Sequence, residues 1–210
     1  MSAKGLQPND SLAYLGINKA KAYWNLSPSE LADLSVEKGQ CQMTSTGAIS
    51  VNTGEFTGRS PKDRFIVEDE ITKDAVWWGN VNLKFDAAKF DALLEKVTAY
   101  LTDKEIYVRD AYACADAKYR MNLRVVTETP WSNMFAYNMF LRPEDLELEG
   151  FDAEWTVINA PGFMADPELD GTRQHNFAIL NFSKKMILVG GTGYTGEIKK
   201  GIFSALNFIL

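Results

Sequence analysis

A glycine-rich turn near the end of the chain constrains the fold more strongly than any other stretch. Residues 186–189 form a short apolar run, which predicts a buried strand, and four glycines follow between positions 190 and 196. Beyond the turn, apolar residues recur along one helical stripe, at Ile198, Ile202, Leu206 and Ile209. A strand, a glycine turn and a helix in this order bring free backbone N–H groups and the positive end of the helix dipole together, which favours an anion.

Two lysines, Lys199 and Lys200, lie in the first turn of this predicted helix. Cations at this end oppose the helix dipole, at a cost of up to ~1 kcal/mol each, and Glu197 offsets only part of that cost. A bound phosphate or carboxylate would offset more of it. Lys200 lies roughly opposite the apolar stripe and is free to reach a ligand, whereas the alternative is a solvated lysine pair on a surface helix.

The same turn partly matches two phosphate-binding patterns. Gly191-x-Gly193-x-x-Gly196 fits the dinucleotide fingerprint between strand and helix, but the acidic residue expected about 20 residues later would lie past the end of the chain. The pattern G-x-x-x-x-G-K-[ST] fits at Gly191 and Gly196 and fails at Glu197 and Ile198. We therefore interpret the turn as an anion-binding candidate of undecided type.

Composition and charge exclude several classes of protein. The chain has 210 residues and a net charge of −6, which argues against nucleic acid as its main partner. Cys41 and Cys114 form no C-x-x-C motif and His175 is the only histidine, so neither a zinc site nor a multi-histidine metal site is expected from this chain alone. No apolar run approaches the ~18 residues of a membrane span, and the N-terminal residues 1–5 (MSAKG) show no signal-peptide core, so we expect no membrane partner and a cytoplasmic location.

Predicted strands and helices are mixed along the chain. The capping box Ser27-Pro28-Ser29-Glu30 predicts a helix that ends near Gly39, Asp86 predicts the cap of a second helix, and residues 130–139 predict a third. Short apolar runs predict strands at 48–51, 65–67, 106–108, 123–127, 155–158, 177–180 and 186–189. This mixture predicts an α/β fold, with α+β as the alternative, built on one mixed β-sheet flanked by helices.

Other segments carry weaker signals. We expect residues 1–10 to be flexible, Trp77 and Trp78 to pack against the core, and residues 160–176 to form a loop on the rim. The last predicted helix is still apolar and periodic at Leu210, without a glycine cap or a proline stop. This ending predicts that the chain is one part of a longer protein.

A second basic loop lies between two of the predicted strands. Arg59 sits in the turn-rich sequence Thr-Gly-Arg-Ser-Pro at residues 57–61, and Lys62 and Arg64 add positive charge. A guanidinium held in such a turn can bind a carboxylate or a phosphate through paired, charge-assisted hydrogen bonds. An ordinary surface arginine beside a turn is the alternative.

The two basic loops are long enough to compare with known families. Residues 53–67 read TGEFTGRSPKDRFIV and residues 190–204 read GGTGYTGEIKKGIFS. Both stretches resemble ATP-dependent phosphoenolpyruvate carboxykinase, and Trp77-Trp78 and residues 138–143 (NMFLRP) fit the same family. The resemblance spans nearly the whole chain but covers only the N-terminal domain of this two-domain family. Members of the family often carry an aromatic residue at the position where this chain has Gly193.

The resemblance implies an enzyme of gluconeogenesis. That enzyme decarboxylates oxaloacetate and transfers the γ-phosphoryl group of ATP to the enolate, which gives phosphoenolpyruvate, ADP and carbon dioxide. Matching motif positions imply that Arg59 binds the substrate carboxylate, that Tyr194 contacts substrate or carbon dioxide, and that Lys199 meets the phosphoryl group. Lys200 would act in catalysis and substrate binding, and would bind the manganese (Mn²⁺) cofactor as a neutral amine, beside Mg²⁺-bound ATP.

The resemblance also implies what this chain lacks. Residues 1–210 would form a single substrate-side domain, while the C-terminal nucleotide-binding domain would carry the phosphate loop, a histidine and an aspartate metal ligand, and a second substrate arginine. His175 precedes the lysine pair, so we interpret it as a surface or loop residue. We expect this part alone to bind no cofactor and to be inactive. The alternatives are a dinucleotide-binding oxidoreductase that uses Gly191, Gly193 and Gly196, or a non-catalytic anion-binding domain.

Overall fold

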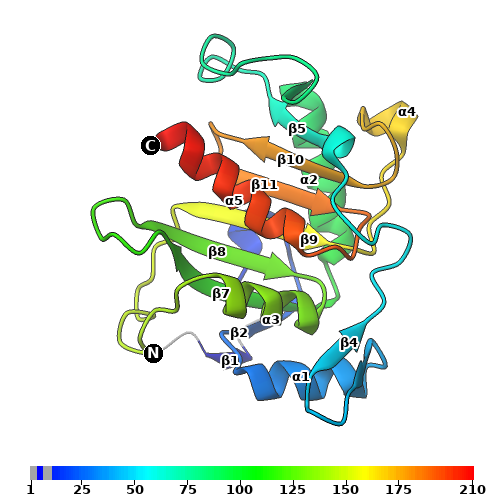
Figure 1. Ribbon diagram of the computed structural model, residues 1–210, viewed down its shortest axis with the longest axis vertical. Helices are drawn as coiled ribbons and strands as arrows, with labels where there is room; N and C mark the ends of the chain where they lie inside the picture. Colours follow the sequence, from blue (N-terminus) through cyan, green and yellow to red (C-terminus); the bar gives the residue numbers. More distant parts are fainter. Residues whose placement is uncertain (1–3, 7–10) are drawn as a thin grey trace.

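The computed structural model describes residues 4–6 and 11–210 and shows one large mixed sheet with helices on both faces (Figure 1). In this part of the chain, the sheet has nine strands in the order β1-β2-β7-β8-β9-β11-β10-β5-β6. Their bounds are β1 Gly5–Leu6, β2 Lys21–Trp24, β5 Arg64–Val67, β6 Leu83–Phe85, β7 Glu105–Ala113, β8 Met121–Thr127, β9 Trp155–Ala160, β10 Phe177–Asn181 and β11 Met186–Gly190. The predicted α/β class with one mixed sheet is confirmed.

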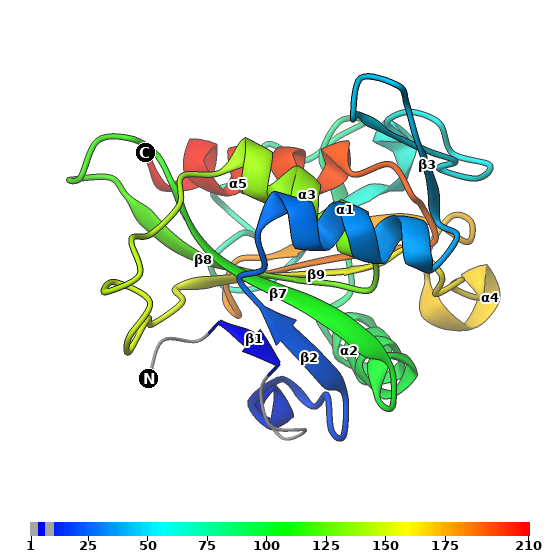
Figure 2. The same ribbon diagram turned by 90° about the horizontal axis from the view of Figure 1, so that it is seen from below.

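The remaining elements surround this sheet. They are the hairpin β3 Cys41–Met43 and β4 Ile49–Val51, the 3-10 helices η1 Ala13–Leu15 and η2 Pro61–Asp63, and the α-helices α1 Pro28–Glu37, α2 Ala87–Leu101, α3 Pro130–Met139, α4 Pro167–Asp170 and α5 Gly196–Ile209. Helices α1, α3 and α5 lie over one face of the sheet, and α2 lies over the other (Figure 2). The strands between them are therefore buried on both faces, which explains their nearly continuous apolar runs.

Both helix caps predicted from the sequence are present. The Ser27 hydroxyl accepts a hydrogen bond from the Glu30 backbone N–H at 3.3 Å, and the Glu30 carboxylate accepts one from the Ser27 N–H at 2.8 Å. The Asp86 carboxylate accepts a hydrogen bond from the Lys89 N–H at 2.9 Å at the start of α2. These side chains satisfy N–H groups that the first turn of a helix leaves without partners.

Two layers of core lie on opposite faces of the sheet. Helix α2 buries Phe90, Leu93, Val97 and Leu101 on one face, among residues from β2, β5, β7 and β11. Helix α5 buries Ile198, Ile202 and Ala205 on the other face, against β8, β9 and β11. The apolar stripe predicted for α5 ends one position early, since Ile209 is 52% exposed.

Strand directions bring the two basic loops to one edge of the sheet. Strands β8, β9 and β11 are mutually parallel, so their carboxyl ends share that edge. Strand β10 forms an antiparallel hairpin with β11 and runs parallel to β5. Because Phe177 pairs with Gly190 and Ala178 pairs with Arg64, strand β5 begins where β11 ends. The Arg59 loop, which precedes β5, therefore meets the glycine turn that follows β11.

The two tryptophans and the predicted rim loop differ from what the sequence predicts. The prediction that Trp77 packs against the core is wrong, because this residue is 86% exposed; it lies in the segment that leads to β6, the strand at the edge of the sheet. Trp78 is only partly buried, with its indole N–H donating to the Lys73 carbonyl at 3.0 Å and the Lys84 ammonium 5.3 Å from its ring. The predicted rim loop 160–176 contains the short helix α4.

The flexibility predicted for residues 1–10 is contradicted for one short segment and concerns undescribed positions for most of the rest. Gly5–Leu6 pairs with β2 as a short strand, while the flexibility predicted for residues 1–3 and 7–10 concerns positions outside the described residues. Within the described ranges, no helix has the length and apolar character needed to cross a membrane.

Candidate functional site

Arg59 and Lys200, more than a hundred residues apart in the sequence, line the same cavity. This cavity has a volume of about 390 Å³ and lies between α5, the start of β5 and the segment before β6. Arg64 lines it as a third cation, while Trp77 and Phe203 contribute to an apolar wall. The juxtaposition of the two basic loops predicted from the resemblance is thus present in the fold.

The glycine turn packs so closely against neighbouring backbone that side chains at Gly191 and Gly193 would not fit. A Cβ atom at Gly193 would lie 2.8 Å from the Thr53 carbonyl oxygen and 2.9 Å from the Thr53 Cα, so the turn touches the chain that leads into the Arg59 loop. Gly191 has a φ of +67°, and a Cβ atom there would overlap the His175 carbonyl. A side chain at Gly193, aromatic or not, would push the two loops apart.

Arg64 connects strand β5 to the first turns of helix α5. Its guanidinium donates hydrogen bonds to the Ser204 hydroxyl at 2.9 Å and to the Lys200 carbonyl at 3.3 Å. Its Nε lies 3.3 Å from a carboxylate oxygen of Glu197, whose side chain is only 5% exposed. Arg64 thereby fixes the helix that carries Lys200 against the strand that follows Arg59.

The charges of this cluster influence one another strongly. Burial raises the pKa of Glu197, while the nearby Arg64 and Arg59 guanidinium groups pull it back toward its ordinary value. Burial lowers the pKa of Arg64, an effect that Glu197 opposes and Arg59 reinforces. Two guanidinium groups therefore share a single buried carboxylate, so an added anion in the cavity would balance the excess positive charge.

A second contact holds the Arg59 loop from its other side. Asp63 is buried and accepts two hydrogen bonds from Arg173, both at 2.8 Å, and one from the Gln174 amide at 2.8 Å. The loop that contains Arg59 is therefore tied both to α5, through Arg64, and to the connection before β10. Such support from both ends restricts where the Arg59 side chain can go.

Tyr194 and Lys199 lie near the cavity but are not among the side chains that line it. The half-buried ring of Tyr194 packs against Gly196, where a Cβ atom would lie 2.5 Å from the ring. Lys199 is exposed on α5, next to the half-buried Lys200. Of the four side chains selected from the sequence, the fold places Arg59 and Lys200 on one cavity, and the roles of all four stay predictions.

Sequence reasoning missed the contribution of Arg64 and Glu197. Both were noted only for their charge, because nothing in their local sequence indicates that they approach one another across the sheet. His175, interpreted as a surface or loop residue, is indeed exposed and lies in the connection before β10.

The donor groups on the described residues decide whether a metal ion fits near the cavity. Among residues 4–6 and 11–210, no group of three His, Cys, Asp or Glu side chains is placed to hold a metal ion. Near the cavity, Glu197 is engaged by Arg64, which leaves Lys200 as the proposed donor on α5. The described residues alone therefore do not fit a manganese site.

Comparisons with known proteins agree with the resemblance. A family model described as phosphoenolpyruvate carboxykinase matches residues 20–210. The chain is 66% identical over 200 residues to phosphoenolpyruvate carboxykinase (ATP) of Christiangramia forsetii, and 64% identical over 200 residues to that of Flavobacterium johnsoniae. Each match covers 95% of this chain and 38% of the relative. The enzyme of Deinococcus radiodurans is 45% identical over 206 residues, which are 98% of this chain and 43% of that relative.

Proposed function

Because the chain belongs to the phosphoenolpyruvate carboxykinase (ATP) family, we propose that it forms the substrate-side, N-terminal domain of a carboxy-lyase. The complete enzyme would convert oxaloacetate and ATP to phosphoenolpyruvate, ADP and carbon dioxide in gluconeogenesis. The chain spans only about 38% of the length of the relatives from Christiangramia forsetii and Flavobacterium johnsoniae. This proposal therefore concerns the activity to which the domain contributes.

One observation carries the proposal: Arg59, Arg64 and Lys200 line one cavity between helix α5 and strands β5 and β10. Oxaloacetate and phosphoenolpyruvate are small anions with adjacent carboxylate and oxygen groups. A guanidinium binds a carboxylate through two parallel hydrogen bonds, whereas an ammonium acts as a compact point charge. The pair suits a ligand that presents a carboxylate to Arg59 and a developing oxyanion to Lys200.

Each predicted site residue has a role in this proposal. Arg59 holds the substrate carboxylate and fixes its orientation. Lys200 stabilises the negative charge that builds up on the carbonyl oxygen as carbon dioxide leaves and the enolate forms. Lys199 meets the phosphoryl group that the enolate oxygen attacks, and Tyr194 contacts substrate or the released carbon dioxide. Arg64 and Glu197 keep the helix with its two lysines in place beside Arg59.

The nucleotide and the metal ions would depend on the rest of the polypeptide. The phosphate loop, the remaining metal ligands and a second substrate arginine are expected in a C-terminal nucleotide-binding domain. In the metal-loaded enzyme Lys200 would release its proton and offer one neutral amine ligand to Mn²⁺, whose charge would then replace that of the ammonium group beside the carbonyl oxygen. Residues 1–210 alone would bind neither ATP nor Mn²⁺ and would be inactive. The cytoplasmic location stays a prediction.

A steady-state assay tests the proposal in the full-length polypeptide that contains this chain. Arg59→Gln and Lys200→Gln should each lower kcat/KM for oxaloacetate by about 10²-fold or more, since each removes a charge that the transition state needs. Lys184→Gln is the matched control, because Lys184 is a surface lysine on the β10–β11 hairpin that forms an ion pair with the exposed Asp91 and does not line the cavity. Unchanged turnover in the first two variants would instead support a non-catalytic anion-binding domain.

The same assay on residues 1–210 alone tests the domain assignment. We expect no oxaloacetate-dependent formation of phosphoenolpyruvate, because no nucleotide site is proposed for this part. Appreciable turnover would contradict the need for a second domain. Titration with NADH serves as a further control, because a fluorescence change that saturates would favour the dinucleotide-binding alternative at Gly191–Gly196.

A further inference from the structure

A second cavity, of about 310 Å³, lies away from the Arg59–Lys200 cavity and shares none of its lining residues. It is enclosed by the start of α1, the middle of β7, the end of α3 and the segment at residues 142–148. Its volume falls within the range of pockets that hold small molecules. The proposed carboxykinase function assigns no role to it.

Arg109 on β7 is the most unusual side chain in this cavity. It is only 4% exposed, and its guanidinium donates hydrogen bonds to the Asn133 amide oxygen at 3.0 Å and to the Leu26 carbonyl. In the described part of the chain, Arg109 has no carboxylate partner and its Nη1 donates no hydrogen bond. Buried arginines are otherwise almost always paired with an anion.

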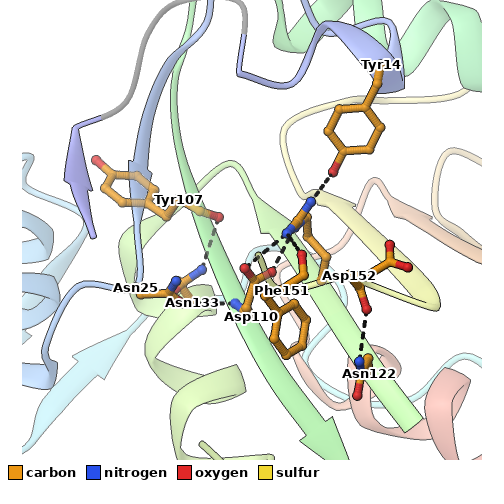
Figure 3. A network of polar contacts seen from close by, with 9 residues as sticks. Tyr14, Asn25, Tyr107, Asp110, Asn122, Asn133, Phe151 and Asp152 are labelled. Atoms are coloured by element: carbon orange, nitrogen blue, oxygen red, sulfur yellow. Dashed lines mark hydrogen bonds and ion pairs between the residues drawn. The ribbon is translucent and has the colours of Figure 1, made fainter. Parts of the chain in front are cut away.

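The carboxylates near Arg109 are engaged elsewhere. Asp110 points its two oxygens at Arg124, which donates to them at 2.7 and 3.0 Å (Figure 3). Figure 3 also shows the Asn133 amide donating to the Tyr107 carbonyl, so the residue that accepts from Arg109 is itself held in place. At the rim of the cavity, Asp145 forms an ion pair with Lys4.

One further carboxylate lies at the rim. The Glu30 carboxylate accepts hydrogen bonds from the Ser27 hydroxyl at 2.6 Å and from the Ser27 N–H at 2.8 Å, as part of the cap of α1. It is therefore committed to the helix start.

A second arginine adds to the positive charge of the cavity. Arg142 is exposed, and its guanidinium lies 4.6 Å from the centre of the Tyr137 ring, while that of Arg109 lies 4.9 Å from the same ring. The pKa of Arg109 is lowered to about 10, chiefly by burial; the charge of Arg142 acts in the same direction, while Tyr137 and Asp110 oppose the change. Two cations thus lie against one aromatic ring, and neither forms an ion pair with a carboxylate in the described part of the chain.

We propose that this cavity binds the phosphate group of a small metabolite, held by the guanidinium groups of Arg109 and Arg142 beside Tyr137. The guanidinium fork matches the geometry of a phosphate, and a bound dianion would neutralise the buried charge of Arg109. Leu26 and Leu148 provide apolar surface for the remainder of the metabolite. Free phosphate and a phosphate ester present the same group to the two arginines, so a comparison of their affinities decides which of them is the ligand.

Isothermal titration calorimetry with orthophosphate and with ribose 5-phosphate tests this proposal. The titrations use the chain with Arg59→Gln, so that the first cavity does not contribute. We expect saturable binding of orthophosphate, and tighter binding of ribose 5-phosphate if the apolar surface covers the ester. Equal affinities would identify free phosphate as the ligand, whereas the absence of saturable binding of both would overturn the proposal.

Arg142→Gln and Arg120→Gln in the same background form a matched pair. Both arginines are exposed and stack on a tyrosine, since Arg120 lies 5.0 Å from the Tyr112 ring, but only Arg142 lines the cavity. Arg142→Gln should weaken binding by about tenfold or more, the loss expected for one charged hydrogen bond, and Arg120→Gln should leave it unchanged. Equal binding by the two variants would overturn the proposal.

A third variant separates a binding role of Arg109 from a purely structural one. Arg109→Gln should abolish binding while its circular dichroism spectrum stays that of the folded chain. A folded Arg109→Gln variant that still binds phosphate with the original affinity would show that this arginine serves only the fold. If this variant does not fold, the result for Arg142→Gln decides.

Discussion

Substitution of Arg64 should destabilise the chain more than substitution of its partner Glu197. At an effective dielectric constant of about 20, two charges 3.3 Å apart attract by about 5 kcal/mol, part of which offsets their desolvation. The two side chains are buried unequally, since Glu197 is 5% exposed and Arg64 is 24% exposed. Arg64→Met leaves a deeply buried carboxylate alone and should cost about 3 kcal/mol.

The reverse substitution should cost less. Glu197→Gln keeps the shape of the side chain and leaves Arg64 bonded to the Ser204 hydroxyl and the Lys200 carbonyl, with water at its exposed part. We expect a loss of about 1–2 kcal/mol in the free energy of unfolding. The double variant should cost less than the sum of the two by about 1–2 kcal/mol, because neither charge is then left without its partner.

The pH dependence of the Arg64→Met variant follows from the shift of the Glu197 pKa. Burial raises this pKa and Arg64 lowers it, so removal of Arg64 raises it further. An acid with a higher pKa in the folded chain binds more protons when folded, and its contribution to stability falls as the pH rises above its unfolded pKa, about 4.3. The deficit of Arg64→Met should therefore be smaller at pH 5 than at pH 8.

Urea denaturation followed by circular dichroism measures all four free energies at both pH values. A larger loss for Glu197→Gln than for Arg64→Met would refute the argument from unequal burial. Strict additivity of the two substitutions would show that the pair contributes no coupling. A deficit of Arg64→Met that grows toward low pH would contradict the direction of the Glu197 pKa shift.

Three further substitutions test the packing and the turns that position the site. Phe90→Ala should lower the free energy of unfolding in urea by about 3–5 kcal/mol, because this side chain of α2 is fully buried; a loss below 1 kcal/mol would contradict its place in the core. Ser27→Ala removes the capping box of α1 and should cost about 1 kcal/mol, measured as a lower Tm, whereas an unchanged Tm would show that the cap is not needed. Gly191→Ala should cost about 1–3 kcal/mol in urea, because the backbone has a φ of +67° and the added methyl group would overlap the His175 carbonyl; a neutral result would refute this close approach.

Much of the local structure could be predicted because it depends on residues close together in the chain. The capping box at Ser27 and the cap at Asp86 mark the starts of α1 and α2, and the predicted helix at residues 130–139 coincides with α3. The strand before the glycine turn and the helix after it are also as predicted. In each case the determining hydrogen bond or apolar stripe lies within a few residues.

Long-range features were harder to predict. The short strands β2 and β6 carry too few residues for a clear alternation of apolar and polar side chains, and they are strands because a neighbour in the sheet pairs with them. Trp77 was expected in the core because aromatic residues usually are, yet its segment lies beyond the edge of the sheet. The pairing of Arg64 with Glu197 depends on the order of the strands, which no local pattern specifies.

The convergence of the two basic loops was predicted from the family resemblance and not from spacing. Strand directions now supply the physical reason, because β5 begins at the edge where β11 ends. The fold shows that Arg59 and Lys200 line one cavity. The roles of these two residues, like those of Tyr194 and Lys199, depend on how a substrate binds and stay predictions.

A ¹H–¹⁵N NMR titration of the chain with phosphoenolpyruvate tests most directly whether the two cationic loops form one site for a small dianion. The account predicts that backbone amides at residues 57–60 and at residues 191–200 shift together, with a single dissociation constant. Shifts confined to one of these two segments, or two different dissociation constants, would contradict it.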